Sequence, residues 1–290
     1  MGKKLSLLLA MSLSATMLLA GCGSGSTGSE TKEAPAAGAA QTKEAEGGTF
    51  KVGLECGYAP FNWTQMDDSN GGVQIDGNAE FAGGYDIEIA KKIADGLGKK
   101  LVIVKTEWDG LVPALTSGKI DAIIAGMSPT AERKQTIDFS DNYYKSNLIM
   151  VVKKGGAYEK ATSIQDFKGA KVTAQLNTFH YTVIDQIKDV KIQPAMDNFP
   201  AMRVALESGM IDGYVSERPE GVSATAANEN FAMVEFKEGF TTSPEDTSIA
   251  VGLAKGSPLA EQINKTLAGI SEEDRTSIMD TAIKNQPAAK

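Results

Sequence analysis

The chain has 290 residues and a formal net charge of −8, and its length allows one large domain or two of ordinary size. Hydrophobic residues make up 42% of it and charged residues 23%, which is usual for a globular protein and sufficient for two modest cores. The acidic balance argues against a nucleic-acid-binding protein, because such a protein presents a basic face to the phosphates. We therefore expect no nucleic-acid partner.

The N-terminus has the composition of an export signal. Lys3 and Lys4 precede an apolar run over residues 5–20, which is too short and too polar for a transmembrane helix. Leu19-Ala20-Gly21-Cys22 follows at once and resembles the lipobox of bacterial lipoproteins, where the Cys thiol receives a diacylglyceryl group. The resemblance implies that residues 1–21 are a signal peptide and that lipid on Cys22 anchors an extracytoplasmic protein to a membrane face. An ordinary secretory peptide with a chance cysteine is the alternative.

Residues 22–48 separate this signal from the rest of the chain. They are rich in Gly, Ser, Thr, Ala, Glu and Lys and contain no aromatic residue, so they are predicted to be a flexible tether. The folded body is predicted to begin at Thr49. Cys56 is the only cysteine within it, so we expect no internal disulfide and interpret Cys56 as a small buried thiol.

Predicted strands and helices alternate along the body. The first half is predicted to contain a strand at 50–54, a helix with one apolar face that ends at Gly98, a strand at 101–104, a helix at 108–117 that stops at Gly118, and a strand at 120–125. The second half is predicted to contain a strand at 171–174, a helix at 178–188, a helix at 199–208 closed by Gly209, and a strand at 211–215. This alternation predicts an α/β fold with buried strands.

The two halves also share a short sequence. Residues 115–121 read Leu-Thr-Ser-Gly-Lys-Ile-Asp and residues 206–212 read Leu-Glu-Ser-Gly-Met-Ile-Asp. Two similar α/β lobes are expected to hold a ligand between them, because clefts between lobes and at the carboxyl ends of strands are favoured binding sites.

Six motifs in the body resemble those of one known family. They are Tyr58-Ala59-Pro60-Phe61, Gly84-Tyr85-Asp86-Ile87, Trp108-Asp109-Gly110-Leu111, residues 124–133, Ile137-Asp138-Phe139-Ser140-Asp141 and residues 208–213. In these motifs and their order the chain resembles the amino-acid-binding receptors of ABC importers, called solute-binding protein family 3. The resemblance implies the periplasmic-binding protein type II fold, in which two Rossmann-like lobes are joined by a two-segment hinge and the ligand cleft lies between them.

The resemblance also implies where the chain crosses between the lobes. The first crossing is expected near residues 142–146 and the return near 245–248. Lobe 1 would then hold residues 49–143 and 247–290, and lobe 2 residues 146–244. Such a hinge closes on a ligand. The implied function is capture of a free amino acid by a monomer without cofactor or metal, followed by delivery to an ABC permease and its ATPase.

A free amino acid brings a carboxylate and an ammonium group, and each needs a charged or strongly polar partner when the closing cleft removes its water. The resemblance assigns the carboxylate to Arg133, whose guanidinium can hold both oxygens at once, with Gly126, Ser128 and Thr130 beside it. Taken alone, an arginine between two charged neighbours would be interpreted as a surface residue.

Glu217 is assigned to the ammonium group and lies just after the strand predicted at 211–215. The family usually has Asp at this position, so Glu217 is a departure that keeps the charge and adds one methylene. Glu220 is a nearby competitor, and a surface ion pair between Glu217 and Arg218 is the other interpretation.

Tyr58 and Trp108 match positions where the family places side chains against the body of the ligand, since an aromatic face suits an aliphatic stem, a ring or a cation. Core packing is the alternative for both. Glu55 matches a position that often carries Asp and faces the far end of the ligand, where a carboxylate favours a cationic or amide side chain. A solvated glutamate at the end of a strand is the alternative.

Thr178, Phe179 and His180 lie at the start of the helix predicted at 178–188 in lobe 2. Thr178 is expected to donate a hydrogen bond to the ligand carboxylate. Phe179 and His180 depart from the small and polar residues that are usual in the family. A lone histidine is more often structural than a ligand, but its place at the pocket makes His180 a candidate specificity residue.

The sequence leaves two other functions and the identity of the ligand open. An enzyme on the same fold, such as a small-molecule dehydratase or lyase, would have only Glu55, Glu217 and His180 as candidate acids or bases, and a sensory module would normally be fused to a membrane-spanning signalling segment. The site leans towards a basic or polar amino acid such as lysine, arginine, histidine or glutamine, although Phe179 and Trp108 can also bracket an aromatic ring. The segment 65–80 is longer than expected for the family.

Overall fold

The computed structural model describes residues 47–287, and all of them belong to one compact unit. The predicted signal peptide, the predicted lipidation site at Cys22 and nearly all of the predicted tether lie outside the described residues. Within residues 47–287, no helix combines the length and the apolar composition needed to cross a bilayer.

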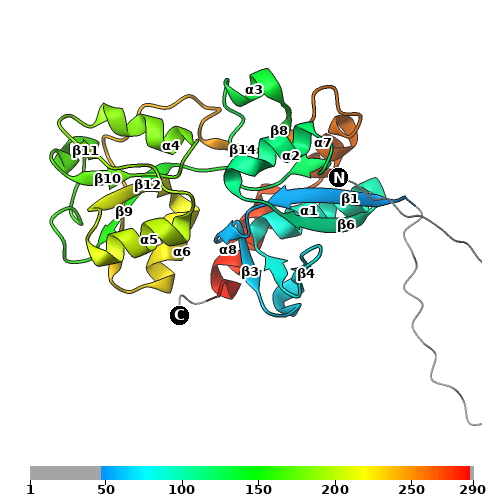
Figure 1. Cartoon of the computed structure of the whole chain (residues 1–290), viewed down its shortest axis with the longest axis horizontal. Helices are drawn as coiled ribbons and strands as arrows, with labels where there is room; N and C mark the ends of the chain where they lie inside the picture. The colour runs from blue at the N-terminus through cyan, green and yellow to red at the C-terminus, as the bar shows by residue number, and fades with distance from the viewer. Residues whose placement is uncertain (1–46, 288–290) are drawn as a thin grey trace, which may run out of the picture. The chain divides into compact units, whose positions relative to one another are not determined.

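The first sheet has five strands in the order β6-β1-β7-β14-β8 (Figure 1). Its strands are β1 (Thr49–Leu54), β6 (Lys100–Lys105), β7 (Ala122–Ile123), β8 (Asp138–Lys145) and β14 (Ser248–Leu253). Its helical elements are α1 (Tyr85–Leu97), η2 (Trp108–Gly110), α2 (Leu111–Thr116), α3 (Arg133–Thr136), α7 (Ala260–Ala268) and α8 (Glu272–Asn285). We call this sheet and these elements lobe 1.

The second sheet also has five strands, in the order β11-β10-β12-β9-β13. Its strands are β9 (Leu148–Lys153), β10 (Lys171–Thr173), β11 (Lys191–Ile192), β12 (Gly213–Glu217) and β13 (Phe231–Val234). Its helical elements are η3 (Ile164–Phe167), α4 (Phe179–Thr182), η4 (Val183–Gln186), α5 (Phe199–Ser208) and α6 (Arg218–Ala227). We call these elements lobe 2.

The two sheets have the same strand order and directions. In lobe 1, β1 lies between β6 and β7 and is parallel to both, and in lobe 2, β10 lies in the same way between β11 and β12. Two antiparallel strands complete each sheet. The repeated heptapeptide occupies the same place in both lobes, because it leads from α2 to β7 and from α5 to β12. These observations confirm the prediction of two similar α/β lobes.

Two connections join the lobes. The chain passes from β8 to β9 through Ser146 and Asn147, and it returns between β13 and β14. The Ser146 backbone N–H donates to the Thr247 carbonyl at 2.9 Å, so the two connections are hydrogen-bonded to each other. Figure 1 shows the two sheets, each with its own helices, and these connections between them.

Glycines end the two helices that the sequence predicted most clearly. Gly98 after α1 and Gly209 after α5 adopt left-handed φ angles of 63° and 79°, which glycine tolerates without the strain of a Cβ. Ile87, Ile89 and Ile93 on α1 are fully buried, so the apolar face of this helix packs into the lobe 1 core as its periodicity predicted.

The segment 65–80 covers one edge of lobe 1. Together with its neighbours it forms a small antiparallel sheet of β2 (Gly57–Tyr58), β3 (Asn62–Gln65), β5 (Phe81–Gly83) and β4 (Val73–Gln74), with the turn η1 (Ser69–Gly71). Ile75 is buried and forms a parallel bridge with Ile103, and the Asp76 N–H donates to the Ile103 carbonyl at 2.8 Å. The segment therefore protects β6, which would otherwise be an open edge strand.

The helix predicted at 108–117 is η2 followed by α2, the strand predicted at 211–215 is shifted to β12, and two further elements differ more. The helix predicted at 178–188 is only the short α4 followed by η4, because the β-branched run Thr182-Val183-Ile184 disfavours a continuous helix. The strand predicted at 120–125 narrows to β7, since the chain turns at Gly126, which has a φ of +62°.

Candidate ligand-binding site

The site residues expected from the sequence gather where the two lobes meet. A cavity of about 760 Å³ lies there, lined by Trp108, Thr130 and Arg133 from lobe 1 and by Thr178 and Phe179 from lobe 2. Tyr58, Glu55, Glu217 and His180 are buried in the same interface rather than on the wall of this cavity. The carboxyl ends of the parallel strands supply most of these residues, as the fold predicts.

Arg133 is a half-buried cation between the lobes. Its Nη1 donates to the Ser128 carbonyl and its Nη2 donates to the Asn177 carbonyl of lobe 2, both at 3.0 Å. Burial lowers the pKa of Arg133 to about 10. Among the described residues no carboxylate forms a salt bridge with it. A guanidinium in this situation gains most from a ligand that carries a carboxylate.

Trp108 and Asn177 fix the position of Arg133. The Arg133 Cζ lies 5.1 Å from the centroid of the Trp108 ring, which is within the range of a cation–π contact. Trp108 Nε1 donates to the Asn177 carbonyl at 3.5 Å, and Asn177 Nδ2 donates to Asp109 Oδ1 at 2.9 Å. Asn177 has a left-handed φ of 55°, a conformation that asparagine tolerates better than most residues. It therefore brings its carbonyl and its amide to lobe 1 together.

The other residues of the 124–133 motif build the backbone around Arg133. Ser128 Oγ donates to the Asp246 carbonyl at 2.8 Å, so its hydroxyl must turn before it can donate to a ligand. Thr130 Oγ1 accepts from the Arg133 N–H at 3.3 Å. Gly126 donates its N–H to the Tyr143 hydroxyl at 3.1 Å, and a Cβ at Gly126 would lie 2.6 Å from the Tyr58 ring. Gly126 thus makes room for Tyr58.

Tyr143 connects this motif to the Gly84-Tyr85-Asp86-Ile87 motif. The Tyr143 hydroxyl donates to Asp86 Oδ1 at 2.7 Å, and Asn62 Nδ2 donates to Asp86 Oδ2 at 2.9 Å. Asp86 is fully buried, and burial raises its pKa to about 6 in spite of these two hydrogen bonds. The buried carboxylate therefore ties α1, β3 and β8 together beneath the site.

Glu217 is a buried carboxylate at the start of α6. It is 2% exposed, and its Oε1 lies 3.3 Å from His180 Nε2. Glu217 Oε2 has no hydrogen-bond partner among the described residues, and both ring nitrogens of His180 lack one with good geometry. The competitor Glu220 accepts from Arg203 and from the Tyr214 hydroxyl within lobe 2. Glu220 Oε2 likewise lacks a hydrogen-bond partner among the described residues, but Glu220 is already paired with the Arg203 cation, whereas Glu217 has no Lys or Arg partner there.

Tyr58 lies flat against an aromatic ring of the other lobe. Its ring is 4.3 Å from that of Phe199 at an interplanar angle of 4°, and its hydroxyl has no hydrogen-bond partner among residues 47–287. Burial raises the pKa of Tyr58, with a further contribution from Glu217. An unpaired buried hydroxyl costs free energy unless a ligand or water supplies a partner.

Glu55 and Gln175 form a second contact between the lobes. Gln175 Nε2 donates to Glu55 Oε2 at 3.0 Å, while Glu55 Oε1 has no partner in the described part of the chain. Burial raises the pKa of Glu55 to about 7. In lobe 2, Thr178 Oγ1 donates to the Gln175 carbonyl at 2.7 Å, and Phe179 packs beside the His180 ring at 4.2 Å.

Comparison with known proteins gives the family. The sequence matches bacterial extracellular solute-binding proteins, family 3, over residues 50–281. The chain belongs to this family. It is a family of solute-binding proteins rather than enzymes, and its members act outside the cytoplasm.

Relatives and solved structures cover most of this solute-binding protein. It is 34% identical to a probable histidine-binding protein of Campylobacter jejuni over 237 residues, and this match covers 81% of this chain and 84% of the relative. It is 31% identical over 293 residues to the glutamine-binding protein GlnH of a Bacillus subtilis ABC transporter, with 99% of both covered. A Streptococcus pneumoniae amino acid ABC transporter substrate-binding protein bound to L-arginine has a TM-score of 0.71, at 28% identity, over 82% of this chain and 95% of the other.

Sequence reasoning missed three residues of this interface. Gln175, Asn177 and Phe199 all come from lobe 2 and contact lobe 1 residues. Phe199 follows the helix N-cap Asn198 and was interpreted only as the start of α5. The short polar run after β10 was a weak signal for the other two, since polar residues at the carboxyl end of a strand often face a ligand.

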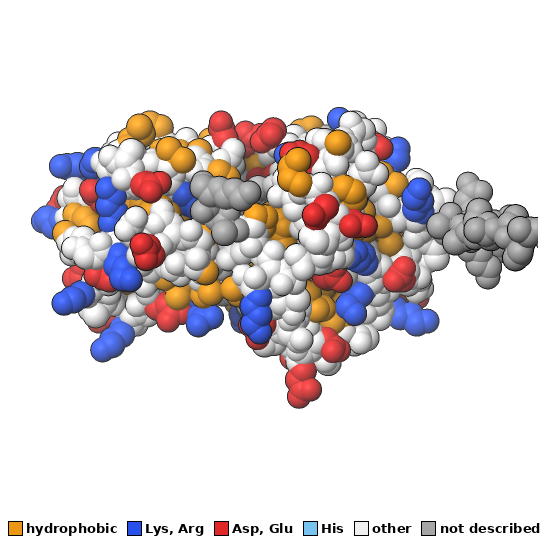
Figure 2. All heavy atoms as spheres, turned by 90° about the horizontal axis from the view of Figure 1, so that it is seen from below, with side chains coloured by type: hydrophobic (Ala, Val, Ile, Leu, Met, Phe, Trp, Pro, Cys, Tyr) orange, Lys and Arg blue, Asp and Glu red, His pale blue; other side chains and the backbone are white. Residues whose placement is uncertain are grey.

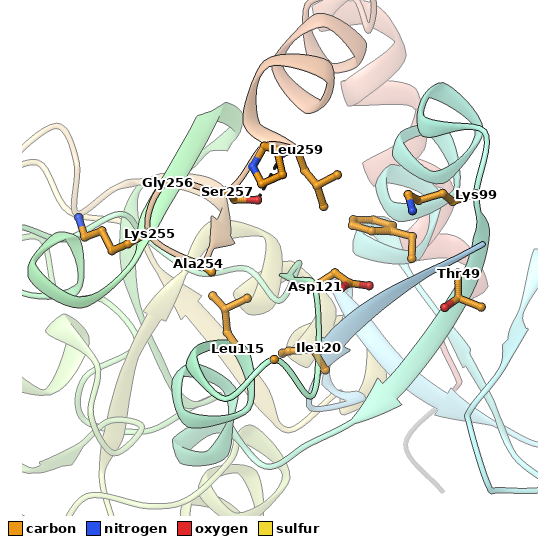
Figure 3. A pocket seen from close by; sticks show the side chains of 13 residues that line it. Thr49, Lys99, Leu115, Ile120, Asp121, Ala254, Lys255, Gly256, Ser257 and Leu259 are labelled. Atoms are coloured by element: carbon orange, nitrogen blue, oxygen red, sulfur yellow. Dashed lines mark hydrogen bonds between the residues drawn. The ribbon is translucent and has the colours of Figure 1, made fainter. Parts of the chain in front are cut away.

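The face shown in Figure 2 and the cavity at the amino ends of β1 and β7 differ from this site in their charged groups. On the face shown in Figure 2, acidic and basic side chains are interspersed rather than gathered by sign. The second cavity, about 420 Å³, lies at the amino ends of β1 and β7 (Figure 3). There Lys255 pairs with Asp138, Lys99 donates to the Gly47 carbonyl, and Asp121 accepts from the Lys51 N–H. Among the residues described, no group of His, Cys, Asp and Glu is arranged to hold a metal ion.

Proposed function

We propose that this solute-binding protein captures a free L-amino acid with a basic or polar side chain and delivers it to an ABC permease and its ATPase. The names of its relatives support this, because they describe binding proteins for histidine, arginine and glutamine, some of them of ABC transporters. A structure of an ancestral arginine-binding protein, 33% identical with a TM-score of 0.65, contains arginine.

The observation that carries the proposal is a half-buried guanidinium and a buried carboxyl group at the lobe interface, each with unused hydrogen-bonding capacity. Arg133 has a desolvated guanidinium without an acidic partner, and Glu217 has a buried oxygen without a partner, within the described residues. One segment of lobe 2 touches both, because Asn177 contacts Arg133 and His180 contacts Glu217. The Cα atoms of residues 177 and 180 are at most about 11 Å apart. Arg133 and Glu217 are therefore held near one short segment, and the proposed ligand is a zwitterion with its carboxylate on Arg133 and its ammonium on Glu217.

Closure of the lobes is the binding event. Arg133, Trp108, Tyr58 and Glu55 come from lobe 1, whereas Glu217 and Thr178 come from lobe 2. A ligand that contacts both sets stabilises the closed form selectively, because only that form offers both. The hinge is proposed at residues 142–146 and 245–248, with lobe 1 as 49–143 and 247–290 and lobe 2 as 146–244.

The rest of the proposal concerns the N-terminus. Residues 1–21 act as the signal peptide, lipid on Cys22 anchors the protein as a monomer to the outer face of a membrane, and residues 22–48 are the tether to the folded body. The lipobox resemblance at residues 19–22 supports this. Labelling with a radioactive fatty acid in a bacterial host tests it, since Cys22→Ser should abolish the label.

Titration calorimetry tests the central proposal. Residues 22–290 with Cys22→Ser, refolded without carried-over ligand, should bind at least one common amino acid with a Kd in the micromolar range or below, and Arg133→Ala should abolish that binding. Absence of binding to every common amino acid would refute the proposal. Binding that survives in Arg133→Ala would refute the assignment of the carboxylate.

A further inference from the structure

Gln175 and Glu55 occupy equivalent places in the two lobes and face each other. Glu55 follows directly after β1, and Gln175 comes two residues after β10, so each lies at the carboxyl end of the strand that has two parallel neighbours in its sheet. Gln175 Nε2 joins the two strand ends by its hydrogen bond to Glu55 Oε2 at 3.0 Å. The contact therefore exists only when the lobes are together.

The Gln175 amide is held in one orientation by its own lobe. Its Nε2 also donates to the Asp197 carbonyl at 3.0 Å, so both of its N–H groups are used. The backbone carbonyl of Gln175 accepts from the Thr178 hydroxyl, and its backbone forms a bridge with Met196, so the residue itself is fixed in place. A donor that is fixed in advance loses little entropy when it meets its acceptor. Gln175 is thus a preformed donor aimed at lobe 1.

Glu55 is a buried acid with one oxygen to spare. It is 6% exposed, Gln175 holds Oε2, and Oε1 has no partner among residues 47–287. The pKa of Glu55 is raised to about 7, chiefly by burial; Glu107 and Asp86 also contribute to the rise, and the Gln175 hydrogen bond opposes it. The Cys56 thiol and the Tyr58 hydroxyl also interact with this carboxylate, and Lys105, which pairs with Leu54 across the sheet, acts on Cys56. None of the groups that shift the pKa of Glu55 is a cation.

The charges of the site indicate what the ligand must bring. If the ligand carboxylate pairs with Arg133 and its ammonium group pairs with Glu217, Glu55 remains as an acid without a counter-charge. A buried ion without a partner is costly, so closure around a neutral side chain forces Glu55 to take up a proton. Closure around a cationic side chain places a positive charge beside Oε1 and keeps Glu55 ionised.

We infer that Gln175 is a positioning residue that holds Glu55 ionised, with Oε1 turned to the ligand, and thereby selects amino acids with a cationic side chain. This inference rests on the proposed function. A hydrogen bond from a neutral donor favours the charged form of a carboxylate. Without it, the closed form would hold Glu55 protonated at neutral pH and would lose its preference for a cation. Because the Gln175–Glu55 hydrogen bond forms only in the closed form, the side chain of the ligand is recognised when the lobes close.

Matched ligands test the inference with the refolded protein described above. L-arginine and L-citrulline have nearly the same shape but differ in charge, and L-lysine and L-norleucine form a second pair. At pH 7.5 the protein should bind one of the two cations at least about tenfold more tightly than its neutral counterpart. Gln175→Leu should reduce this ratio of affinities to about threefold or less, mainly by lowering the affinity for the cationic amino acid. In Gln175→Leu the affinity for the cation should also fall more steeply as the pH is lowered from 8 to 6.

Two control variants separate positioning from a general structural role. Gln193→Leu makes the same change in lobe 2 at a side chain that donates only to the nearby Lys191 carbonyl, and it should leave the ratio unchanged. In a Glu55→Gln background, Gln175→Leu should have no further effect on the ratio, because the two residues act as one unit.

The outcomes distinguish this inference from the proposed function. If the protein binds no amino acid, both are refuted. If it binds neutral amino acids as tightly as cationic ones, the proposed function stands and the inference is wrong. If Gln175→Leu lowers the affinity for the cationic amino acid and for its neutral counterpart equally, Gln175 is only a structural contact between the lobes and the inference is again wrong.

Discussion

Replacing Arg133 with methionine should separate ligand affinity from protein stability. The ligand carboxylate would lose its cation in a buried site, which costs about 3–5 kcal/mol. The hydrogen bond from Arg133 to the Asn177 carbonyl of the other lobe would also be lost from the closed form, at about 1 kcal/mol. Because 1.4 kcal/mol corresponds to tenfold in Kd, the affinity for the amino acid should fall about 1,000- to 10,000-fold.

The free energy of unfolding should change little in the same variant. Burial lowers the pKa of Arg133 from 12.5 to about 10, so the charged form is disfavoured in the folded protein at every pH below that value, by about 3 kcal/mol. The two hydrogen bonds to carbonyls, about 1 kcal/mol each, and the contact with Trp108, about 0.5–2 kcal/mol, offset this cost. Methionine removes the cost and the contacts together, so we expect a net change within about 1 kcal/mol.

Calorimetry with the preferred amino acid and urea unfolding of the ligand-free protein measure the two quantities. Arg133→Lys is the matched control, because it keeps the charge but loses the two-pronged geometry, at about 1.5–3 kcal/mol or roughly 10- to 150-fold in Kd. An affinity of Arg133→Met close to that of the wild type would refute the assignment. So would a loss of unfolding free energy as large as the loss of binding free energy, since Arg133 would then be structural.

Three further substitutions test the surroundings of the site. Gly126→Ala combines a left-handed φ with a Cβ placed 2.6 Å from the Tyr58 ring, so the unfolding free energy should fall by about 2–4 kcal/mol in urea; wild-type stability would contradict this. Arg203→Met leaves the fully buried Glu220 without its cation and should cost about 3–5 kcal/mol, most of which Arg203→Met with Glu220→Leu should restore. Burial raises the pKa of Asp86 to about 6, so its contribution to stability is present below about pH 4 and is lost as the pH rises through 6. The unfolding free energy of Asp86→Asn relative to that of the wild type should therefore rise by about 2–3 kcal/mol from pH 4 to pH 8. A difference that does not depend on pH would show that Asp86 does not titrate in this range.

The sequence was most informative where a local pattern decides the structure. The apolar face of α1 and its terminal Gly98 need only residues within one helix, and the heptapeptide repeated before β7 and β12 reports the duplicated topology directly. The α4 region was predicted less well because helical periodicity at 178–188 competes with the β-branched residues at 182–184.

The site was predictable on the lobe 1 side and only partly on the lobe 2 side. Arg133 and Trp108 lie in motifs that carry their own context, and the structure brings them into contact. Gln175, Asn177 and Phe199 contact residues that lie more than 40 positions away in the chain. No periodicity or spacing within lobe 2 encodes a partner in lobe 1, so such contacts appear only once both lobes are placed.

The position of β14 has a consequence for the order in which the protein folds. β14 lies between β7 and β8 in the lobe 1 sheet, yet it follows the whole of lobe 2 in the sequence. Lobe 2 takes all five of its strands from one continuous stretch of chain, so its sheet can be complete while the C-terminal part is still being made or exported. Lobe 1 must instead wait for a strand about 100 residues beyond β8 and bear the entropy of closing that loop. A chain that stops before Ser248 should therefore form lobe 2 but leave β8 without a neighbour, and refolding of the whole protein should be limited by the arrival of β14.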